Sequence, residues 1–528
     1  MSHATVIFYL GCDFGNTFNI VFQQLNQSPQ KAMVWLESDP AFFALTLASC
    51  SLESILQSNR CFIIIGGDWD KELAELFDEQ NFFTIERPDI FLSATARHTN
   101  RLSIWQPLMN YITTWIQKGR RDYAEVLQRI RQYYDAKPPE RIKRIMALYM
   151  SEQDGKAIPY IQQRFLDECQ RLGVYIIYHR PGFRCDVSFI RTIQKEQPDL
   201  LLFINKSPDE YTDRKILDSI RLPRLTWCLD DPNCFIKENF GQNDFVFTWD
   251  KWYIKNLQDM QAKSVDFFPY VADLDLVDSS FQERFRSPVS YIGQVKSFTP
   301  DEWGLDDKTA ELVKHAAKLK AFQPQHDYKT LIMEYQADFG VSIIQSLSDA
   351  LPQFVRYSIY ITANALRRIW LLEAALPFGL KIYGNDDWLD LLKDNPLLDC
   401  YAGPADPERD VPHIFASSQI NLNIHSLQAL TSLNQRDFNC PVSGGFLLTD
   451  WVEDADDFFK PNEEMVFYNG RDDLRNKIEY YLEHSDERQA IINRGRARVL
   501  SEHTYAARAP KVLETLKNRI VQRYTTHG

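Results

Sequence analysis

The chain has 528 residues, of which 45% are hydrophobic, 25% charged and 13% aromatic, the composition of an ordinary globular protein. This length exceeds what a single hydrophobic core supports, so we expect roughly three domains. The formal net charge of −13 argues against a nucleic-acid partner, because no extended basic patch is present to replace phosphate counterions.

The sequence also argues against disulfides, structural zinc and a membrane span. Nine cysteines are scattered along the chain without a CxxC spacing. The first residues show no basic leader and no small-residue cleavage pattern, and no apolar run approaches the length of about 18 residues that indicates a transmembrane helix. We therefore expect a cytoplasmic protein.

Residues 1–137 are expected to form a small α/β accessory domain with a helical extension. Strand-like runs are separated by helical lengths, and a helix is expected at 105–134 before a double proline that marks a linker. Gly11 and Gly15 follow the first strand but match no phosphate-loop pattern, so we interpret them as a tight turn. The expected strands are 6–10, 31–36 and 61–65.

Residues 138–285 alternate strands and helices, which predicts a Rossmann-like parallel sheet with its ligand crevice at the carboxyl ends of the strands. The expected strands are 145–150, 174–178, 200–205, 225–229, 245–249 and 265–270. Asp230 and Asp231 directly follow the fourth of them. Three interpretations of this pair are open: a general base with its neighbour, an ordinary turn, or a metal-binding pair. The metal-binding pair is disfavoured, because adjacent strand residues point to opposite sides.

Residues 286–505 predict a second Rossmann-like sheet. A strand at 288–292 leads into Gly293 and Gln294, where backbone without a Cβ can meet a phosphate, and a strand at 380–383 leads into Gly384. The expected helices of this part are 308–320, 329–350 and 361–375, and three further helices are expected at 472–484, 487–500 and 504–520.

The segment 419–451 is the most informative one, because it predicts half of a nucleotide site. Alternating apolar residues indicate a strand that ends at His425, and Thr431 or Ser432 is expected to cap a helix that carries Asn434, Arg436 and Asn439. A helix start and a guanidinium together favour a phosphate.

Proline and glycine are expected to end this helix and to open the backbone beside it. Pro441 is predicted to stop the helix, and Gly444 and Gly445 to let the backbone approach a ligand before the next strand.

His425 is a candidate for contact with the donor or the acceptor, or for proton transfer. The alternative is that it is a structural hydrogen-bond partner.

Several motifs of this part occur together in one known family. LNxRxF, a small-residue pair with FLLTD, DFFKPNEEMVFY and IEYYLEHSDERQAIINRGRARVLSEHTYAAR resemble the C-terminal lobe of the spore-maturation CgeB-type glycosyltransferases. The similarity covers about residues 140 to 520. It implies a GT-B-like fold, in which two Rossmann-like lobes face a cleft and a terminal helix, here 506–528, crosses back to the first lobe.

The resemblance also implies roles for individual residues. Asp231 lies in the family's Asp-Asp-Pro and is expected to act as general base or to position the acceptor. Gly384 is expected to lie beside the edge of the nucleotide base, and Glu464 to bind the ribose or the sugar. Asn439 stands where relatives usually carry a Glu for the donor ribose, and it lacks that charge.

We thus expect a glycosyltransferase that moves a sugar from a nucleoside-diphosphate sugar to a glycan or protein acceptor, without a metal or a tightly bound cofactor. The alternatives are a catalytically weak or inactive scaffold subunit, favoured by Asn439 and the extra first domain, and a nucleotide-sugar epimerase on the same fold. The candidate catalytic residues are Asp231, His425 and Arg436; the candidate donor-binding residues are Gly293, Gln294, Gly384, Asn434, Arg436, Asn439, Gly444, Gly445 and Glu464.

Overall fold

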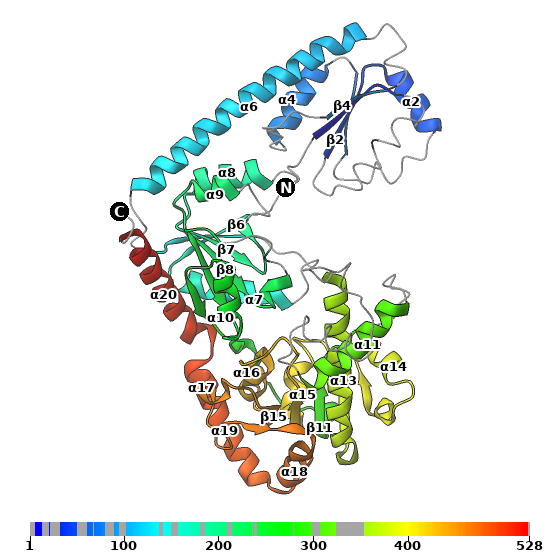
Figure 1. Cartoon of the computed structure of the whole chain (residues 1–528), viewed down its shortest axis with the longest axis vertical. Coiled ribbons are helices and arrows are strands. Elements are labelled where there is room, and N and C mark those ends of the chain that lie inside the picture. Colours follow the sequence, from blue (N-terminus) through cyan, green and yellow to red (C-terminus); the bar gives the residue numbers. More distant parts are fainter. Residues whose placement is uncertain are drawn as a thin grey trace. The chain divides into compact units, whose positions relative to one another are not determined.

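The computed structural model places the chain in the α/β class, as predicted, with three sheets whose paired strands run parallel (Figure 1). The chain forms two compact units, one of Met1–Gly155, Val174–Arg224 and Ile520–Gly528, and one of Lys156–Gly173 and Leu225–Arg519. The structure describes residues 6–12, 21, 32–49, 61–66, 68–79, 89–93, 102–136, 141–148, 157–179, 185–208, 214–234, 236, 240–277, 279–297, 307–323 and 353–525.

The first sheet has the strand order β3-β2-β1-β4. Its centre is β2, in which all six side chains are buried, and the long helix α6 packs Leu108 and Ile112 against the same core. The strands are β1 (Val6–Leu10), β2 (Ala32–Glu37), β3 (Cys61–Ile65) and β4 (Asp89–Leu92); the helices are α2 (Pro40–Ser49), α4 (Trp69–Glu79) and α6 (Leu102–Ala136).

The second sheet has the order β10-β9-β8-β7-β5-β6. Every side chain of β7, β8 and β9 is buried, as expected for strands covered by helices on both faces. The strands are β5 (Arg144–Leu148), β6 (Tyr175–His179), β7 (Leu200–Ile204), β8 (Arg224–Cys228), β9 (Asp244–Thr248) and β10 (Val265–Phe267); the helices are α7 (Ala157–Arg171), α8 (Cys185–Glu196), α9 (Arg214–Asp218) and α10 (Tyr253–Asp259).

The third sheet has the order β13-β12-β11-β14-β15-β16 and carries the largest described core, with Trp388 and Tyr291 completely buried. The strands are β11 (Ser287–Ile292), β12 (Leu380–Tyr383), β13 (Tyr401–Gly403), β14 (Ser418–Asn423), β15 (Leu447–Asp450) and β16 (Val466–Tyr468). Short 3-10 helices are η3 (Pro232–Cys234), η4 (Leu274–Leu276), η5 (Glu283–Phe285), η6 (Leu376–Phe378) and η7 (Pro396–Cys400).

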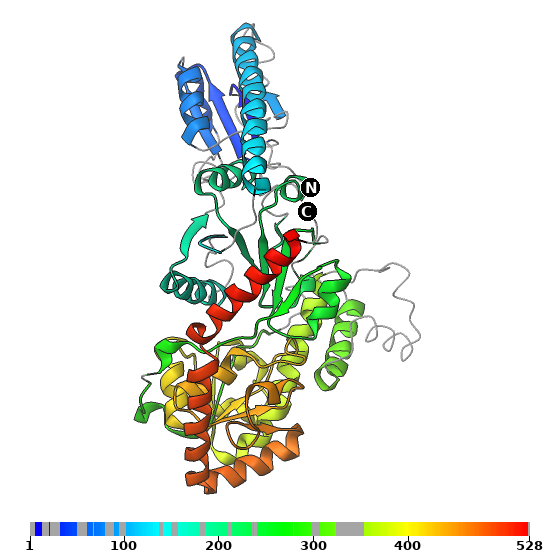
Figure 2. The ribbon, with the colours of Figure 1, turned by 90° about the vertical axis from the view of Figure 1, so that its left-hand side faces the viewer.

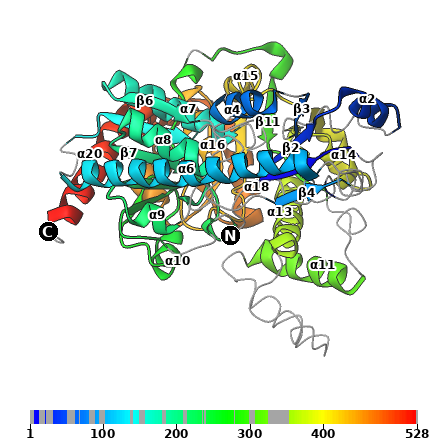
Figure 3. The ribbon, with the colours of Figure 1, turned by 90° about the horizontal axis from the view of Figure 1, so that it is seen from above.

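Helices α11 and α13 pack together beside this sheet (Figure 3), through small residues such as Ala316, Ala317 and Ala363 that let the two helices approach closely. The helices are α11 (Asp307–Phe322), α13 (Gln353–Ala375), α14 (Asp387–Leu391), α15 (Val411–Ser417), α16 (Gln435–Val442), α17 (Ala455–Phe458), α18 (Gly470–Glu483), α19 (Ser485–Glu502) and α20 (Tyr505–Thr525). The helix predicted at 329–350 lies outside the described residues.

The C-terminal helix α20, red in Figure 2, follows α19 and contacts the second sheet. Arg519 forms a bidentate pair with the carboxylate of Asp266 on β10, with N–O distances of 2.8 and 3.1 Å. The backbone N–H of Ala272 donates to the carbonyl of His503 at 2.7 Å, just before the helix begins. No helix in the described ranges combines the length and the apolar character that crossing a membrane requires.

Two local predictions about α16 were wrong. The N-cap is Asn434, not Thr431 or Ser432, because Asn434 accepts the N–H of Arg436 at 2.9 Å while Asp437 accepts the N–H of Asn434 at 2.8 Å. Pro441 lies inside the helix, which ends one residue later at Val442. The later N-cap makes this capping box possible, because Asp437 stands three residues after Asn434.

Candidate functional site

The candidate site lies at the carboxyl edge of the third sheet. In a parallel sheet all strands end at the same edge, so the residues after β11, β12, β14 and β15 come together there. Gly293, Gly384 and His425 follow the first three of these strands and Asp450 ends β15, and all four belong to the second compact unit.

The loop after β11 is held by side chains from the β12 end. The N–H of Gly293 donates to the carbonyl of Tyr383 at 2.9 Å, and the indole of Trp388 donates to the carbonyl of Gly293 at 2.8 Å. The amide of Asn385 binds both the N–H and the carbonyl of Val295, at 2.9 and 2.8 Å. The backbone around Gly293 is therefore preorganised.

Gly384 serves this packing. A Cβ on Gly384 would lie 2.3 Å from the carbonyl oxygen of Gly293 and 2.5 Å from the indole nitrogen of Trp388. The glycine is thus required by the approach of two loops of the chain itself. Its predicted role beside a nucleotide base has no support in these contacts.

Two arginines from different helices flank Gly293. Arg436 of α16 donates to the carbonyl of Ile292, and Arg368 of α13 donates to the carbonyl of Gln294, so the two guanidinium groups bind the residues just before and just after the glycine. Arg436 is half-buried and Arg368 is buried, and Nε of Arg368 has no hydrogen-bond partner. A guanidinium carries five N–H donors, so one carbonyl leaves capacity for an anionic ligand.

Arg368 is not among the site residues predicted from the sequence, because the helical pattern of 361–375 indicates only a face that packs in the core. The available signal was the Arg367–Arg368 pair in an otherwise apolar helix, since buried arginines need acceptors.

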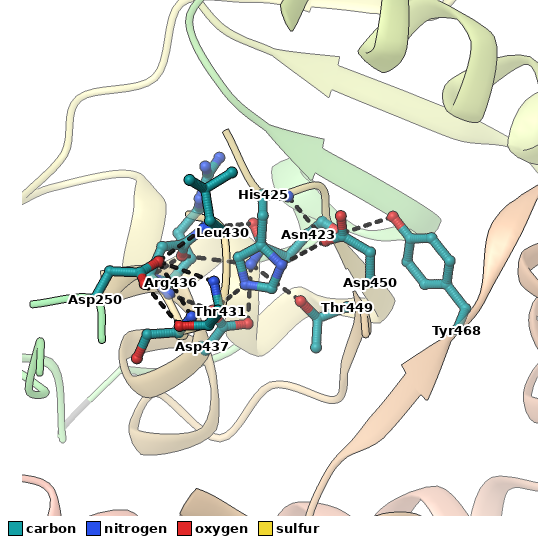
Figure 4. A network of polar contacts seen from close by, with 12 residues as sticks. Asp250, Asn423, His425, Leu430, Thr431, Arg436, Asp437, Thr449, Asp450 and Tyr468 are labelled. Carbon is teal, nitrogen blue, oxygen red and sulfur yellow. Dashed lines mark hydrogen bonds and ion pairs between the residues drawn. The ribbon is translucent and has the colours of Figure 1, made fainter. Parts of the chain in front are cut away.

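A buried charge network lies beneath this edge, with His425 between two carboxylates (Figure 4). The imidazole Nε2 donates to Asp437 at 2.7 Å, and Nδ1 lies 2.7 Å from Asp450 as an ion pair without the direction of a good hydrogen bond. Asp450 also accepts the backbone N–H of His425 at 2.8 Å and pairs with Arg367 of α13 at 3.2 Å.

Polar side chains of the neighbouring strands complete the network. The amide of Asn423 donates to Asp437 at 2.9 Å and to the hydroxyl of Thr449 at 3.1 Å, and Tyr468 donates to the carbonyl of Asn423 at 3.0 Å. All these groups are buried, so the network ties β14, β15, β16 and α16 together.

This environment makes His425 an imidazolium. Burial lowers the pKa of His425, but the charges of Asp437 and Asp450 outweigh it and raise the pKa to about 10. Burial likewise raises the pKa of Asp450, and the charges of His425 and Arg367 outweigh it and hold that pKa well below its usual range. With an exposed fraction of 3% and both ring nitrogens paired, His425 does not fit the predicted proton transfer or ligand contact.

Asn434 is also occupied by structural contacts. Its side-chain oxygen caps α16 through the N–H of Arg436, and its own N–H is bound by Asp437. Asn434 and Asp437 therefore already occupy N–H groups at the start of α16, which leaves the helix start less able to bind a separate anion. The guanidinium of Arg436 is the stronger anion-binding feature of α16.

Asp231 forms a turn at the end of the second sheet. Its carboxylate accepts the backbone N–H and the side-chain amide of Asn233, at 3.0 and 2.8 Å, and the residue is half-exposed. Burial first and the charge of the neighbouring Asp230 second raise the pKa of Tyr270 above its usual range, and burial is the main cause of the raised pKa of Tyr360 on α13, to which Asp230 adds.

Gly444, Gly445 and Glu464 lie at the opposite edge of the sheet. They directly precede β15 and β16, whose amino ends are separated from the carboxyl edge by the strand length, roughly 13 Å for four residues. Their position gives no support to the predicted donor contacts, which stay predictions.

Each of these three residues has a packing role instead. Gly444 has a φ of +81°, as a residue just after a helix often does. A Cβ on Gly445 would lie 2.7 Å from the carbonyl oxygen of Phe415. Glu464 accepts the N–H of Lys460 at 2.9 Å.

Asn439, in the second turn of α16, accepts the backbone N–H of Asp273 at 3.2 Å. Asp273 belongs to the segment between β10 and β11, so Asn439 holds the segment that connects these two strands.

Among the described residues no group of three or more His, Cys, Asp or Glu side chains could hold a metal ion.

Comparison with known proteins assigns residues 367–514 to the family described as glycosyl transferase-like. This stretch contains Arg367, Arg368, His425, Arg436, Asp437 and Asp450. This stretch of the chain is therefore similar to glycosyl transferases, and it contains the part of the candidate site that follows residue 366.

Solved structures with similar chain traces include a glycosyltransferase from Rickettsia africae ESF-5, with 11% identity over 72% of this chain and 98% of that chain and a TM-score of 0.43. Another is HepE from Anabaena in complex with UDP and glucose, with 11% identity over 71% of this chain and 100% of that chain and a TM-score of 0.40. Sequence identities and TM-scores this low assign no role to individual residues of this chain. No curated protein matches the sequence.

Replacement of Gly445 by Ala is expected to lower the free energy of unfolding by about 1–3 kcal/mol, because the added Cβ collides with backbone and with the Sγ of Cys440 at 2.7 Å. Urea denaturation measures this. Gly444→Asn is the matched control, since nothing lies within 4 Å of its Cβ position and Asn tolerates a positive φ. If Gly444→Asn weakened nucleotide binding while preserving stability, its assignment to the far edge would be contradicted.

Replacement of His425 by Gln is expected to destabilise the protein by about 3–5 kcal/mol near neutral pH, because it leaves two buried carboxylates with too little positive charge. The folded pKa of about 10 lies above the unfolded value of 6.5, so this contribution is complete below pH 6.5 and is lost as pH rises through 10. Urea denaturation of wild type and variant across this range should show the difference shrinking.

The exposed His484 supplies the control, and His484→Gln should leave stability nearly unchanged. A difference between wild type and His425→Gln that did not change with pH would contradict a buried imidazolium.

Proposed function

We propose that this protein is a glycosyltransferase of the CgeB type, which transfers a sugar from a nucleoside-diphosphate sugar to a glycan or protein acceptor. The observation that carries the proposal is that the residues matched by the glycosyl transferase-like family include the charge network and both arginines beside Gly293. In this proposal the third sheet binds the donor and the second sheet presents the acceptor.

The two arginines supply the chemistry that the donor requires. Cleavage of a glycosyl–phosphate bond leaves negative charge on the diphosphate, and guanidinium groups placed at that charge lower the barrier. Arg436 and Arg368 reach the carbonyls on both sides of Gly293, so a diphosphate that lies along this loop meets a positive charge from α13 and one from α16. Lys296, exposed in the same loop and paired with Asp387 at 3.6 Å, adds a third cation.

The role of His425 in this proposal is to hold the site. Its charge neutralises Asp437, which caps α16, and Asp450, which ends β15. Arg436 then extends from a helix whose first turn is anchored to the strands.

Asp231 remains the proposed general base or acceptor-positioning residue. It follows β8 at the carboxyl end of the second sheet, is half-exposed, and accepts only local hydrogen bonds from Asn233 among the contacts described.

We propose the domain limits 1–137 for the accessory domain, 138–285 for the acceptor side, 286–505 for the donor side and 506–528 for the returning helix. The pair between Arg519 and Asp266 supports the last of these. The contact of Asn439 with the backbone of Asp273 favours the alternative of a scaffold subunit with weak donor binding, because that amide is turned to the connecting segment.

A thermal-shift panel of UDP, GDP, ADP, CDP and TDP and their sugars tests the proposal, because a ligand of the native state raises the melting temperature. We expect one nucleotide to stabilise the wild type. Arg436→Ala should abolish that shift and lower turnover by about a hundredfold, the loss found for a single transition-state charge donor.

Arg436→Lys is the control, since it keeps the charge but not the planar fork, and it should recover part of the shift. Absence of any shift with wild type would remove the donor site, and binding without transfer to any acceptor would favour the scaffold alternative.

Arg368→Ala is expected to weaken the same nucleotide by about tenfold or more, because it removes a charged hydrogen bond to the phosphates. Isothermal titration measures this. Arg471→Ala serves as the control, since Arg471 pairs with Glu373 away from the Gly293 loop. Equal affinities of wild type and Arg368→Ala would exclude Arg368 from the phosphate site.

A further inference from the structure

Asp250 is a fully buried carboxylate that binds the loop before α16 (Figure 4). It follows β9 of the second sheet. Its Oδ2 accepts three successive backbone N–H groups of that loop, from Leu430 at 2.7 Å, Thr431 at 3.0 Å and Ser432 at 3.2 Å. Convergence of consecutive N–H groups on one oxygen is the geometry of an anion-binding nest.

The second oxygen of the same carboxylate is also satisfied. Oδ1 accepts the hydroxyl of Thr431 at 2.7 Å and the N–H of Trp252 at 2.8 Å. A carboxylate offers about four lone-pair positions, so these five contacts saturate it. The protein thus binds its own carboxylate as it would bind a separate anion.

The loop that Asp250 holds connects the two functional parts of the third sheet. It begins after His425 of the charge network and ends at Asn434, the N-cap of α16. Arg436 stands two residues beyond that cap. Any displacement of Leu430 to Ser432 is therefore transmitted to the cap and to the guanidinium beside Gly293.

Neighbours of Asp250 hold the same region by weaker contacts. The hydroxyl of Tyr253 donates to the carbonyl of Gln428 at 3.0 Å, and Lys251 pairs with Asp454 at 3.0 Å. Of these three residues, Asp250 is the one that accepts backbone N–H groups of the loop, which are costly to leave unpaired in a buried position.

We propose that Asp250 is a positioning residue of the donor site: its carboxylate fills the nest of Leu430, Thr431 and Ser432 and thereby sets the position of Asn434 and Arg436. The effect on donor binding rests on the proposed function, whereas the effect on the loop does not. A negative charge is required, since an amide in this place presents an NH₂ group to backbone N–H donors.

The test compares wild type with Asp250→Ala by hydrogen exchange and by titration with UDP, GDP and ADP. We expect faster exchange confined to residues 428–436 and an increase in the nucleotide Kd of about tenfold to a hundredfold. Sodium formate should reverse both changes by occupying the emptied nest, and sodium chloride at the same concentration should not. Loss of packing alone is not repaired by a small carboxylate.

Matched variants separate the nest from the rest of the contact region. Lys251→Ala removes a neighbouring charge that reaches Thr431 only through Asp454, so it should change loop exchange and Kd much less than Asp250→Ala does. Thr431→Val should reproduce a smaller part of the Asp250 effect and Thr431→Ser should restore it, because Ser keeps the hydroxyl donor. If Asp250→Ala does not fold, Asp250→Asn and the Thr431 pair give the same comparison.

Unchanged exchange at 428–436 in Asp250→Ala, or changes that formate leaves in place, would overturn the proposal. If exchange responds to the substitution and to formate but wild type binds none of the three nucleotides, the loop role stands and the proposed function fails. If exchange responds and wild type binds but the Kd of Asp250→Ala is unchanged, the link to the donor site is overturned.

Discussion

A balanced set of buried charges is the constraint on which the candidate site depends. His425 and Arg367 supply two positive groups, and Asp437 and Asp450 supply two negative ones, from β15, α13, α16 and the end of β14. Burial of each charge alone would be costly, so the four stay together only while all four elements keep their places. The helix that carries Arg436 is therefore coupled to the strands by electrostatics as well as by packing.

The same principle extends to the backbone at this edge. The Gly293 loop is bound by Trp388 and Asn385, the loop before α16 is bound by Asp250, and the first turn of α16 is capped from within by Asn434 and Asp437. These contacts fix the backbone at the edge. Against this rigid background the guanidinium groups of Arg368 and Arg436 are the groups best placed to meet an anion.

The prediction of the fold from sequence was largely successful, whereas that of the site was mixed. Strands such as 61–65 and 380–383 match the structure because short apolar runs between turn residues leave the chain few alternatives. Gly293, Gln294 and Arg436 lie together, since each follows or faces the carboxyl end of a parallel strand, and their role in donor binding stays a prediction. The sequence did not show that Gly444, Gly445 and Glu464 lie at the opposite edge, because local pattern does not state at which edge of the sheet a loop lies.

The sequence by itself determined the alternation of strands and helices, and hence the parallel sheets, because periodicity and glycine or proline positions act within a few residues. Only the tertiary structure decided that His425 is buried between two carboxylates, that Asn439 holds the segment at Asp273, that Asp250 binds the loop before α16 and that Arg368 binds the Gly293 loop. Asp250 meets Thr431 across 181 positions of the sequence. Such partners are set by the packing of distant elements, and no local pattern of residues encodes them.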